Sequence, residues 1–205
     1  MGGPWRGESM SSFEFLFSLF GLLLGFTLVE VLSGLVRTTR TMRTRAGGTE
    51  TRIRVGWLTP LLALFVMLDI ASYWENIWPM REFVSVGFDT IFGGLLIAGG
   101  YYFAASMVFP DDAAAWPDLD EWFWLHRRQV LGPLFIINVL WISLYSTLAP
   151  SGRGMVGLAI SLGTYFSLLA VAFLVRRPGV VATALGFLSL YYLYLGVEDF
   201  ISRFS

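Results

Sequence analysis

The sequence predicts an all-α membrane protein, a bundle of six transmembrane helices with both termini on the non-cytoplasmic side. The 205-residue chain is 56% hydrophobic and only 14% charged. A soluble domain of this length could not keep so much apolar surface from water. The apolar residues form six long stretches, and the arginines lie unevenly between them. We therefore expect a single membrane domain over residues 1–205.

Each apolar stretch is long enough to supply the roughly 20 residues that cross about 30 Å of hydrocarbon. The expected helices cover, in chain order, residues 12–35, 57–78, 83–109, 129–148, 155–175 and 179–201. The first stretch is too long for a cleaved signal peptide, and a basic segment follows it instead of a small-residue cleavage site. The six helices would form three hairpins, and no internal repeat relates them.

The positions of the arginines predict the orientation. Ten of the fourteen lie in the loops after the first, third and fifth helices, and four lie on the other side. Because positively charged loops stay in the cytoplasm, residues 1–11 form an external N-terminal segment, while the Arg-rich loop 36–56 and the loop 110–128 are cytoplasmic. Every basic residue except the histidine is an arginine, which is typical of a GC-rich bacterial genome. The expected location is the inner (plasma) membrane, with multiple passes.

The two main cytoplasmic loops are expected to contact the membrane surface or a partner. The Arg-rich loop 36–56 suits anionic lipids. In the loop 110–128, Pro117 followed by Asp118 favours the start of a helix. Nearby aromatic and apolar side chains are placed to lie among the lipid headgroups: Trp116, Leu119, Trp122 and Phe123. An interfacial anchor is the first interpretation of this loop, and a docking surface for a membrane-protein partner is the second.

Missing residue types exclude several kinds of chemistry. Without cysteine there is no disulfide, iron–sulfur cluster or thiolate metal site. Without lysine no Schiff base to retinal or pyridoxal phosphate can form. The single histidine, His126, cannot provide bis-histidine haem ligation within one chain. Since no phosphate loop and no nucleophile–base motif occurs either, we expect no enzyme activity, no cofactor and no nucleic-acid partner.

Carboxylates inside the predicted helices are the main candidates for function. A charged side chain at the centre of a membrane helix costs at least about 2.5 kcal/mol, so it needs a partner or a water-filled cavity. Asp69 is expected near the middle of the second helix, on the same face as Tyr73 and Asn76. Asp89 is expected about two turns into the third helix, and Asn138 near the middle of the fourth. If these faces converge, they form a polar funnel that opens outward.

The sixth helix is expected to contribute Tyr191, Tyr194 and Glu198 to the same funnel, because these residues share one face. Such a site offers oxygen ligands without thiolate or imidazole, which suits a proton or a hard cation. The predicted ion-binding residues are Asp69, Asp89, Tyr73, Asn76 and Asn138.

This set predicts a transporter or channel for protons or hard cations. The alternative is a buried polar network that fixes helix packing in a non-catalytic accessory or scaffold subunit of a larger membrane complex.

The first helix carries a possible ion pair between Glu30 and Arg37, which are seven residues apart on one stripe. Arg37, Arg40 and Arg43 repeat every third residue, as in voltage sensors, but mostly threonines separate them and they follow a complete span. We therefore favour a helical extension into the cytoplasm or an anionic-lipid anchor.

Small residues are expected to allow close helix packing. Gly21 and Gly25 form a GxxxG motif on the first helix, and Gly93 and Gly100 lie on the Asp89 face of the third. The faces of Gly21 and Gly25, and of Gly94 and Ala98, provide close-packing surfaces beyond those that one bundle needs. A homo-oligomer is therefore expected.

Overall fold

The computed structural model describes residues 12–46, 56–77, 87–148 and 155–202, and these residues contain helices and no strand. In chain order the elements are α1 (Ser12–Ala46), α2 (Leu58–Ile77), α3 (Phe88–Ser106), η2 (Ala113–Ala115), α4 (Leu119–Leu148), α5 (Met155–Leu174) and α6 (Pro178–Ser202). The predicted all-α helical bundle is confirmed. The expected external segment 1–11, and residues 47–55 of the Arg-rich loop, lie outside the described residues.

The chain is a membrane protein by the length and composition of its helices. Four helices, α1, α2, α3 and α6, are long and apolar enough to cross a membrane, and α5 has a shorter apolar stretch at Ala159–Leu174 within the described residues. Their outward surfaces carry large apolar side chains, as on α1, where Leu22, Phe26 and Val29 are each more than half exposed. Lipid tails are the surroundings that such a surface fits. That α4 and α5 also cross the membrane remains a prediction.

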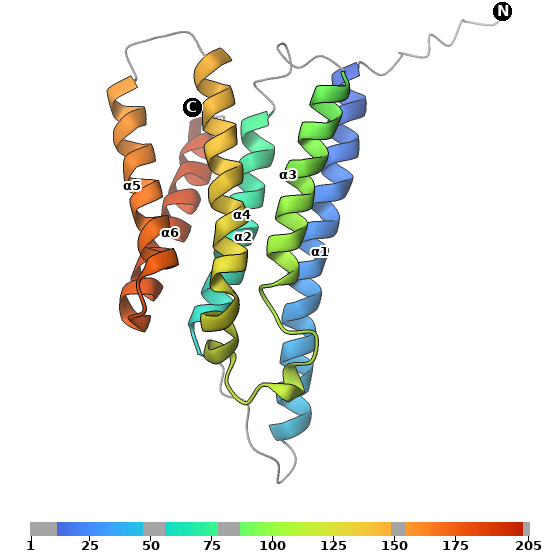
Figure 1. The fold of residues 1–205 in the computed structure, drawn as a ribbon, viewed down its shortest axis with the longest axis vertical. Helices are drawn as coiled ribbons and strands as arrows, with labels where there is room; N and C mark the ends of the chain where they lie inside the picture. Colours follow the sequence, from blue (N-terminus) through green and yellow to red (C-terminus); the bar gives the residue numbers. More distant parts are fainter. Residues whose placement is uncertain (1–11, 47–55, 78–86, 149–154, 203–205) are drawn as a thin grey trace, which may run out of the picture.

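The helices run in alternating directions, so that Ser12 and Ser202 lie at the same end of the bundle (Figure 1). Packing contacts form a closed cycle in the order α1, α3, α4, α5, α6 and α2, and α2 also touches α4 across the middle. The connections from α3 to α4 and from α5 to α6 lie at the other end (Figure 1). This arrangement is the one that three consecutive hairpins produce.

The three largest differences from the predicted helix boundaries are at the end of α1 and at the starts of α3 and α4. α1 continues eleven residues beyond the predicted end at position 35, as the helical-extension interpretation expects, because no glycine or proline occurs in residues 36–46. α3 begins at Phe88 instead of position 83. α4 begins at Leu119, ten residues before the predicted membrane span but directly after Pro117 and Asp118, where a helix start was expected. The Asp118 carboxylate accepts a hydrogen bond from the Asp120 N–H over 2.9 Å and caps the helix.

The early start of α4 changes the interpretation of the loop 110–128. Leu119 and Phe123 are fully buried in the protein instead of lying among lipid headgroups. The hydroxyl of Thr59, also buried, donates to the Leu119 carbonyl over 2.9 Å and so joins the first turns of α2 and α4. Trp122 is half-buried, and its indole N–H donates to the Met107 carbonyl over 3.1 Å.

The core lies along α2 and α4. Half of the most apolar stretch of α2 is buried inside the protein, compared with 22% to 28% of the corresponding stretches of α1, α3 and α6. Phe65 and Val66 on α2 pack in one cluster with Leu131 and Leu134 on α4 and with Leu185 on α6. Because α2 is the most enclosed of these helices, a polar side chain on its inner face lies at the centre of the bundle.

Candidate functional site

Asp69 on α2 is the central polar residue of the bundle. Its side chain is completely buried, with 0% of its surface exposed. The neighbours on its own face of α2, Val66 and Tyr73, are buried as well. A carboxylate at such a position must be neutral or must receive strong hydrogen bonds.

Four side chains from four other helices donate hydrogen bonds to Asp69. The hydroxyl of Tyr101 on α3 lies 3.0 Å from Oδ2. The hydroxyls of Tyr165 on α5 and Tyr192 on α6 lie 2.9 and 2.5 Å from Oδ1. The Nδ2 of Asn138 on α4 lies 3.2 and 3.3 Å from the two oxygens. Five helices therefore meet at one carboxyl group.

Further contacts hold this cluster in place. The Asn138 amide also donates to the Leu134 carbonyl over 2.9 Å, which fixes its orientation along α4. The ring of Tyr73 packs against Tyr101 at a centroid distance of 5.6 Å and against Trp141 at 5.2 Å. Tyr73 therefore supports the site through its ring.

The chemistry of the site suits a proton better than a metal ion. Burial favours the neutral acid, whereas four donated hydrogen bonds favour the carboxylate, so the protonation state depends on the balance of two large opposing effects. Within the described residues, no three His, Asp or Glu side chains are grouped so that they could hold a metal ion. A hard cation needs several acceptor oxygens around it, but the groups nearest Asp69 all donate to it.

A groove between the C-terminal halves of α2 and α6 leads to one of these donors. Its volume is about 740 Å³, and Tyr192 and Ser72 are among its lining residues. Glu75 and Asn76 on α2 and Glu198 on α6 line the same groove. Its lining residues belong to the C-terminal halves of α2 and α6, which lie toward the end of the bundle where α1 begins (Figure 1). The groove brings polar side chains next to the residue that bonds Asp69.

The structure brings together only part of the predicted ion-binding set. Asn138 is in direct contact with Asp69, and Tyr73 is adjacent. Asn76 is exposed and donates to the Ser72 carbonyl of its own helix over 2.7 Å. The prediction that Asp89 shares the site is wrong. Because α3 begins only at Phe88, Asp89 lies exposed in its first turn, where the helix dipole favours a carboxylate.

The sixth helix is rotated relative to its predicted orientation. Tyr191, Tyr194 and Glu198 are exposed, and the Tyr191 hydroxyl bonds that of Ser161. Tyr192 points inward instead, because one residue along a helix rotates the side chain by about 100°. Tyr101, Tyr165 and Tyr192 were not among the predicted site residues. A signal was present for Tyr165, which lies near the middle of its predicted helix, as Asp69 and Asn138 do in theirs.

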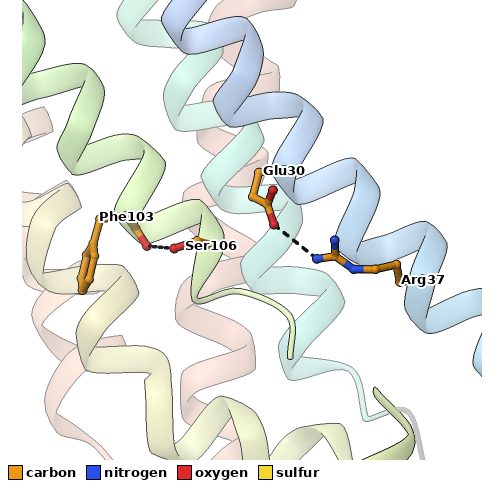
Figure 2. A network of polar contacts seen from close by, with 4 residues as sticks. All are labelled: Glu30, Arg37, Phe103 and Ser106. Atoms are coloured by element: carbon orange, nitrogen blue, oxygen red, sulfur yellow. Dashed lines mark hydrogen bonds and ion pairs between the residues drawn. The ribbon is translucent and has the colours of Figure 1, made fainter. Parts of the chain in front are cut away.

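The ion pair suggested for α1 is present. Arg37 Nη2 lies 3.2 Å from Glu30 Oε1, on a surface where the side chains are 43% and 26% exposed (Figure 2). Nearby on α3, the Ser106 hydroxyl donates to the Phe103 carbonyl over 2.9 Å. Glu30 is thus paired along its own helix and lies apart from the Asp69 cluster.

The glycines predicted to pack helices divide into two groups. A Cβ at Gly21 would lie 2.1 Å from Trp74, and one at Gly100 would lie 3.0 Å from Ile137, so both allow close packing within the chain. A Cβ at Gly25 or Gly93 would have nothing within 4 Å. A Cβ at Gly94 would lie 2.0 Å from Phe20, and Ala98 is buried. Gly21, Gly94 and Ala98 are therefore used within one chain, and only the Gly25 side of the GxxxG motif remains open.

The site as a whole is one enclosed carboxyl group, three tyrosine hydroxyls and one amide, with a groove beside one tyrosine. No protein family, curated protein or solved structure matches this chain.

Proposed function

We propose that this chain is a small, multi-pass, non-enzymatic protein of the plasma membrane that carries protons, with Asp69 as the proton-binding group. The observation that supports the proposal most directly is the convergence of Tyr101, Asn138, Tyr165 and Tyr192 on one fully buried carboxyl group. A hydroxyl both donates and accepts, so the tyrosines can bond Asp69 in its charged and its neutral form. The wider expectation of a hard-cation transporter is narrowed to a proton because Asp69 has four hydrogen-bond donors around it and no second carboxylate among the hydrogen-bond partners that the described residues supply.

The groove between α2 and α6 supports an access route from the end of the bundle where α1 begins and α6 ends. Glu75 and Glu198 can attract and exchange protons there. Tyr192 lines the groove and donates to Asp69, so a proton reaching Tyr192 is one hydrogen bond from the carboxyl group. This side would be the outer one under the predicted orientation.

Proton flux into proteoliposomes tests the proposal. We expect Asp69→Asn to abolish flux, because the amide keeps the size of the side chain and cannot take up the proton. Asp89→Asn is the matched control, since it makes the same change at an exposed carboxylate outside the cluster. Equal flux in the parent protein and in Asp69→Asn would contradict the proposal, provided that thermal unfolding curves show that both proteins are folded. So would a parent protein that carries no protons under any imposed gradient.

A second candidate function is a non-catalytic accessory or scaffold subunit of a larger membrane complex. It is favoured by the apolar packing one to two turns before Asp69 on α2. There Leu62, Phe65 and Val66 share a buried cluster with residues of α4, which include Leu131 and Leu134. In this case the hydrogen bonds of Asp69 serve to fix five helices relative to one another. A stoichiometric protein partner that copurifies, together with absent flux, would favour this second function.

The orientation that both candidates assume can be tested directly. A reporter that is active only in the periplasm, fused after Ser205, should give a signal because ten arginines lie on the opposite side. A signal from a cytoplasmic reporter at the same position would place the groove on the inner side.

The homo-oligomer also remains a proposal. The open side of α1 at Gly25 can accept a second copy without a clash. Mass measurement in nanodiscs that finds only monomer would contradict it.

A further inference from the structure

A cleft with three arginines lies at the end of the bundle opposite the groove between α2 and α6. Its lining residues come from the start of α4 and from the connection between α5 and α6: Trp124, Leu125, Arg127, Arg128 and Arg176. The cleft has a volume of about 610 Å³, within the range of small-molecule sites. Its lining includes no carboxylate.

Arg127 forms the rigid floor of this cleft. Its side chain is only 2% exposed, and Nη1 donates to the Ala172 carbonyl over 3.0 Å and to the Val175 carbonyl. These carbonyls belong to the C-terminal end of α5, where a positive charge is favourable. The guanidinium carbon also lies 4.5 Å from the centre of the Trp124 ring. Since a guanidinium carries five N–H donors, the two bonds of Nη1 leave others for a ligand.

The other two arginines are exposed and hold their charges near Arg127. The Arg128 guanidinium carbon lies 5.5 Å from the centre of the Phe173 ring, which restricts its side chain. Burial, and then the charges of Arg128 and Arg176, lower the pKa of Arg127, which precedes the apolar part of α4. Among the residues the structure describes, none of the three forms an ion pair with a carboxylate. Within the described part of the chain, three neighbouring positive charges therefore lack a carboxylate counter-charge.

We propose that this cleft binds the phosphate of an anionic phospholipid headgroup. Arginine matches phosphate oxygens with paired N–H donors, and a tryptophan beside the site fits the boundary between headgroups and acyl chains. The exposed apolar side chain of Leu125, on the rim of the cleft, would meet the start of the acyl chains. The site is separate from Asp69 and does not depend on proton transport.

The test uses the full-length protein in phosphatidylcholine nanodiscs to which phosphatidylglycerol is added. Bound phosphatidylglycerol is counted by native mass spectrometry, and the melting temperature is followed in parallel. The test variant is Arg128→Gln with Arg176→Gln, which changes two exposed residues of the cleft. The control is Arg177→Glu, which lowers the net charge by the same two units at an exposed position at the same end of the bundle, outside the cleft and outside the Arg-rich loop 36–56.

We expect the cleft variant to bind phosphatidylglycerol about thirtyfold more weakly, from the usual effect of two arginines on anionic lipid binding. The control should stay within about threefold of the parent, because it loses only long-range attraction. Equal weakening in both variants would overturn the proposal, since it would reflect net charge alone.

A second arm separates the lipid from a free phosphate. Inorganic phosphate is added to nanodiscs of phosphatidylcholine alone. No rise in melting temperature supports a lipid ligand. A rise as large as that given by phosphatidylglycerol, absent in the cleft variant, would identify free phosphate as the ligand and overturn the lipid assignment. If all three proteins have the same melting temperature without added ligand, the substitutions leave the fold intact. A lower melting temperature of the cleft variant under this condition would show that its arginines stabilise the fold, and would count against the proposal.

Discussion

The Tyr165 hydroxyl on α5 donates a hydrogen bond to Asp69 Oδ1 on α2 over 2.9 Å, across a separation of 96 residues in the chain. α5 packs mainly against its neighbours α6 and α4, so this bond crosses the centre of the cycle of helices. Tyr101 makes a comparable bond from α3. Asp69 thus connects helices that share little direct packing, and the same group can fix the bundle and bind a proton.

We expect Tyr165→Phe to lower the free energy of unfolding by about 1 to 2 kcal/mol, because it removes one donor from a buried carboxyl group. The ring packing against Phe166 and Tyr192 is retained. The measurement is an unfolding titration in mixed micelles.

Tyr102→Phe provides the matched control, since Tyr102 is 49% exposed and adjacent to Tyr101. It should change stability by less than about 0.5 kcal/mol. Equal losses in Tyr165→Phe and Tyr102→Phe would show that the hydrogen bond to Asp69 adds no stability.

The fold could be predicted because hydropathy reports helix length directly. The helix start at Pro117 and Asp118 was predicted, because the Asp118 cap is a local effect of the sequence. The continuity of residues 119–128 with the fourth membrane helix was missed, since their mixture of charged and aromatic residues resembles an interfacial anchor. The burial of Leu119 and Phe123 within the bundle is a tertiary effect.

The site was harder to predict because membrane helices are apolar on all sides. Lipid-facing and protein-facing positions then look alike, and helix rotation leaves little trace in composition. The predicted site face of α6 contained Tyr191, whereas in the structure the side chain of Tyr192 points inward. The depth of a residue along its helix was a better guide to the site than the helix face it lies on. Asp69, Asn138 and Tyr165 all lie near the middle of their predicted helices.

Gly34→Ala should destabilise the protein by about 1 to 3 kcal/mol through overpacking. A Cβ at Gly34 would lie 2.8 Å from the Cβ of Phe109, an atom so close to the backbone that a rotamer change cannot move it away. Phe109 itself is only 4% exposed. Thermal unfolding in one detergent measures the effect.

Gly25→Ala on the same helix is the control for helix propensity. Because nothing lies within 4 Å of its Cβ position, it should be neutral or stabilising by up to about 1 kcal/mol in the monomer. A loss of stability at Gly25 that depends on protein concentration would instead support the homo-oligomer.

Asp120 should make stability depend on pH in the acid range. Burial, and to a lesser extent the charge of Asp118, raise the pKa of Asp120, while a hydrogen bond from the Leu58 N–H opposes the shift. The folded protein then binds the proton of the Asp120 carboxyl group more tightly than the unfolded chain does. The stability that this proton contributes is complete below the pKa of Asp120 in the unfolded chain and is lost as pH rises through its pKa in the folded protein.

Asp120→Asn should remove the loss of stability with rising pH, because the amide oxygen still accepts the hydrogen bond from Leu58 and the amide has no charge to bury. Unfolding free energies measured through the acid range should vary less with pH in this variant than in the parent. Asp111→Asn, at an exposed position in the connection that precedes α4, should follow the parent. A variant with the same pH dependence as the parent would show that Asp120 does not control it.

The ion pair between Glu30 and Arg37 should contribute little to stability and nothing to proton flux. Both side chains are partly exposed and can reach the aqueous boundary, so a double-mutant cycle with Glu30→Gln and Arg37→Gln should give a coupling of about 0.2 to 1 kcal/mol. The coupling should shrink between low and high salt, because mobile ions screen exposed charges. Proteoliposomes of Glu30→Gln should retain the flux of the parent, since Glu30 lies outside the hydrogen bonds of Asp69. A loss of flux in Glu30→Gln that matches Asp69→Asn would place Glu30 on the proton path and move the access route to the side of α1.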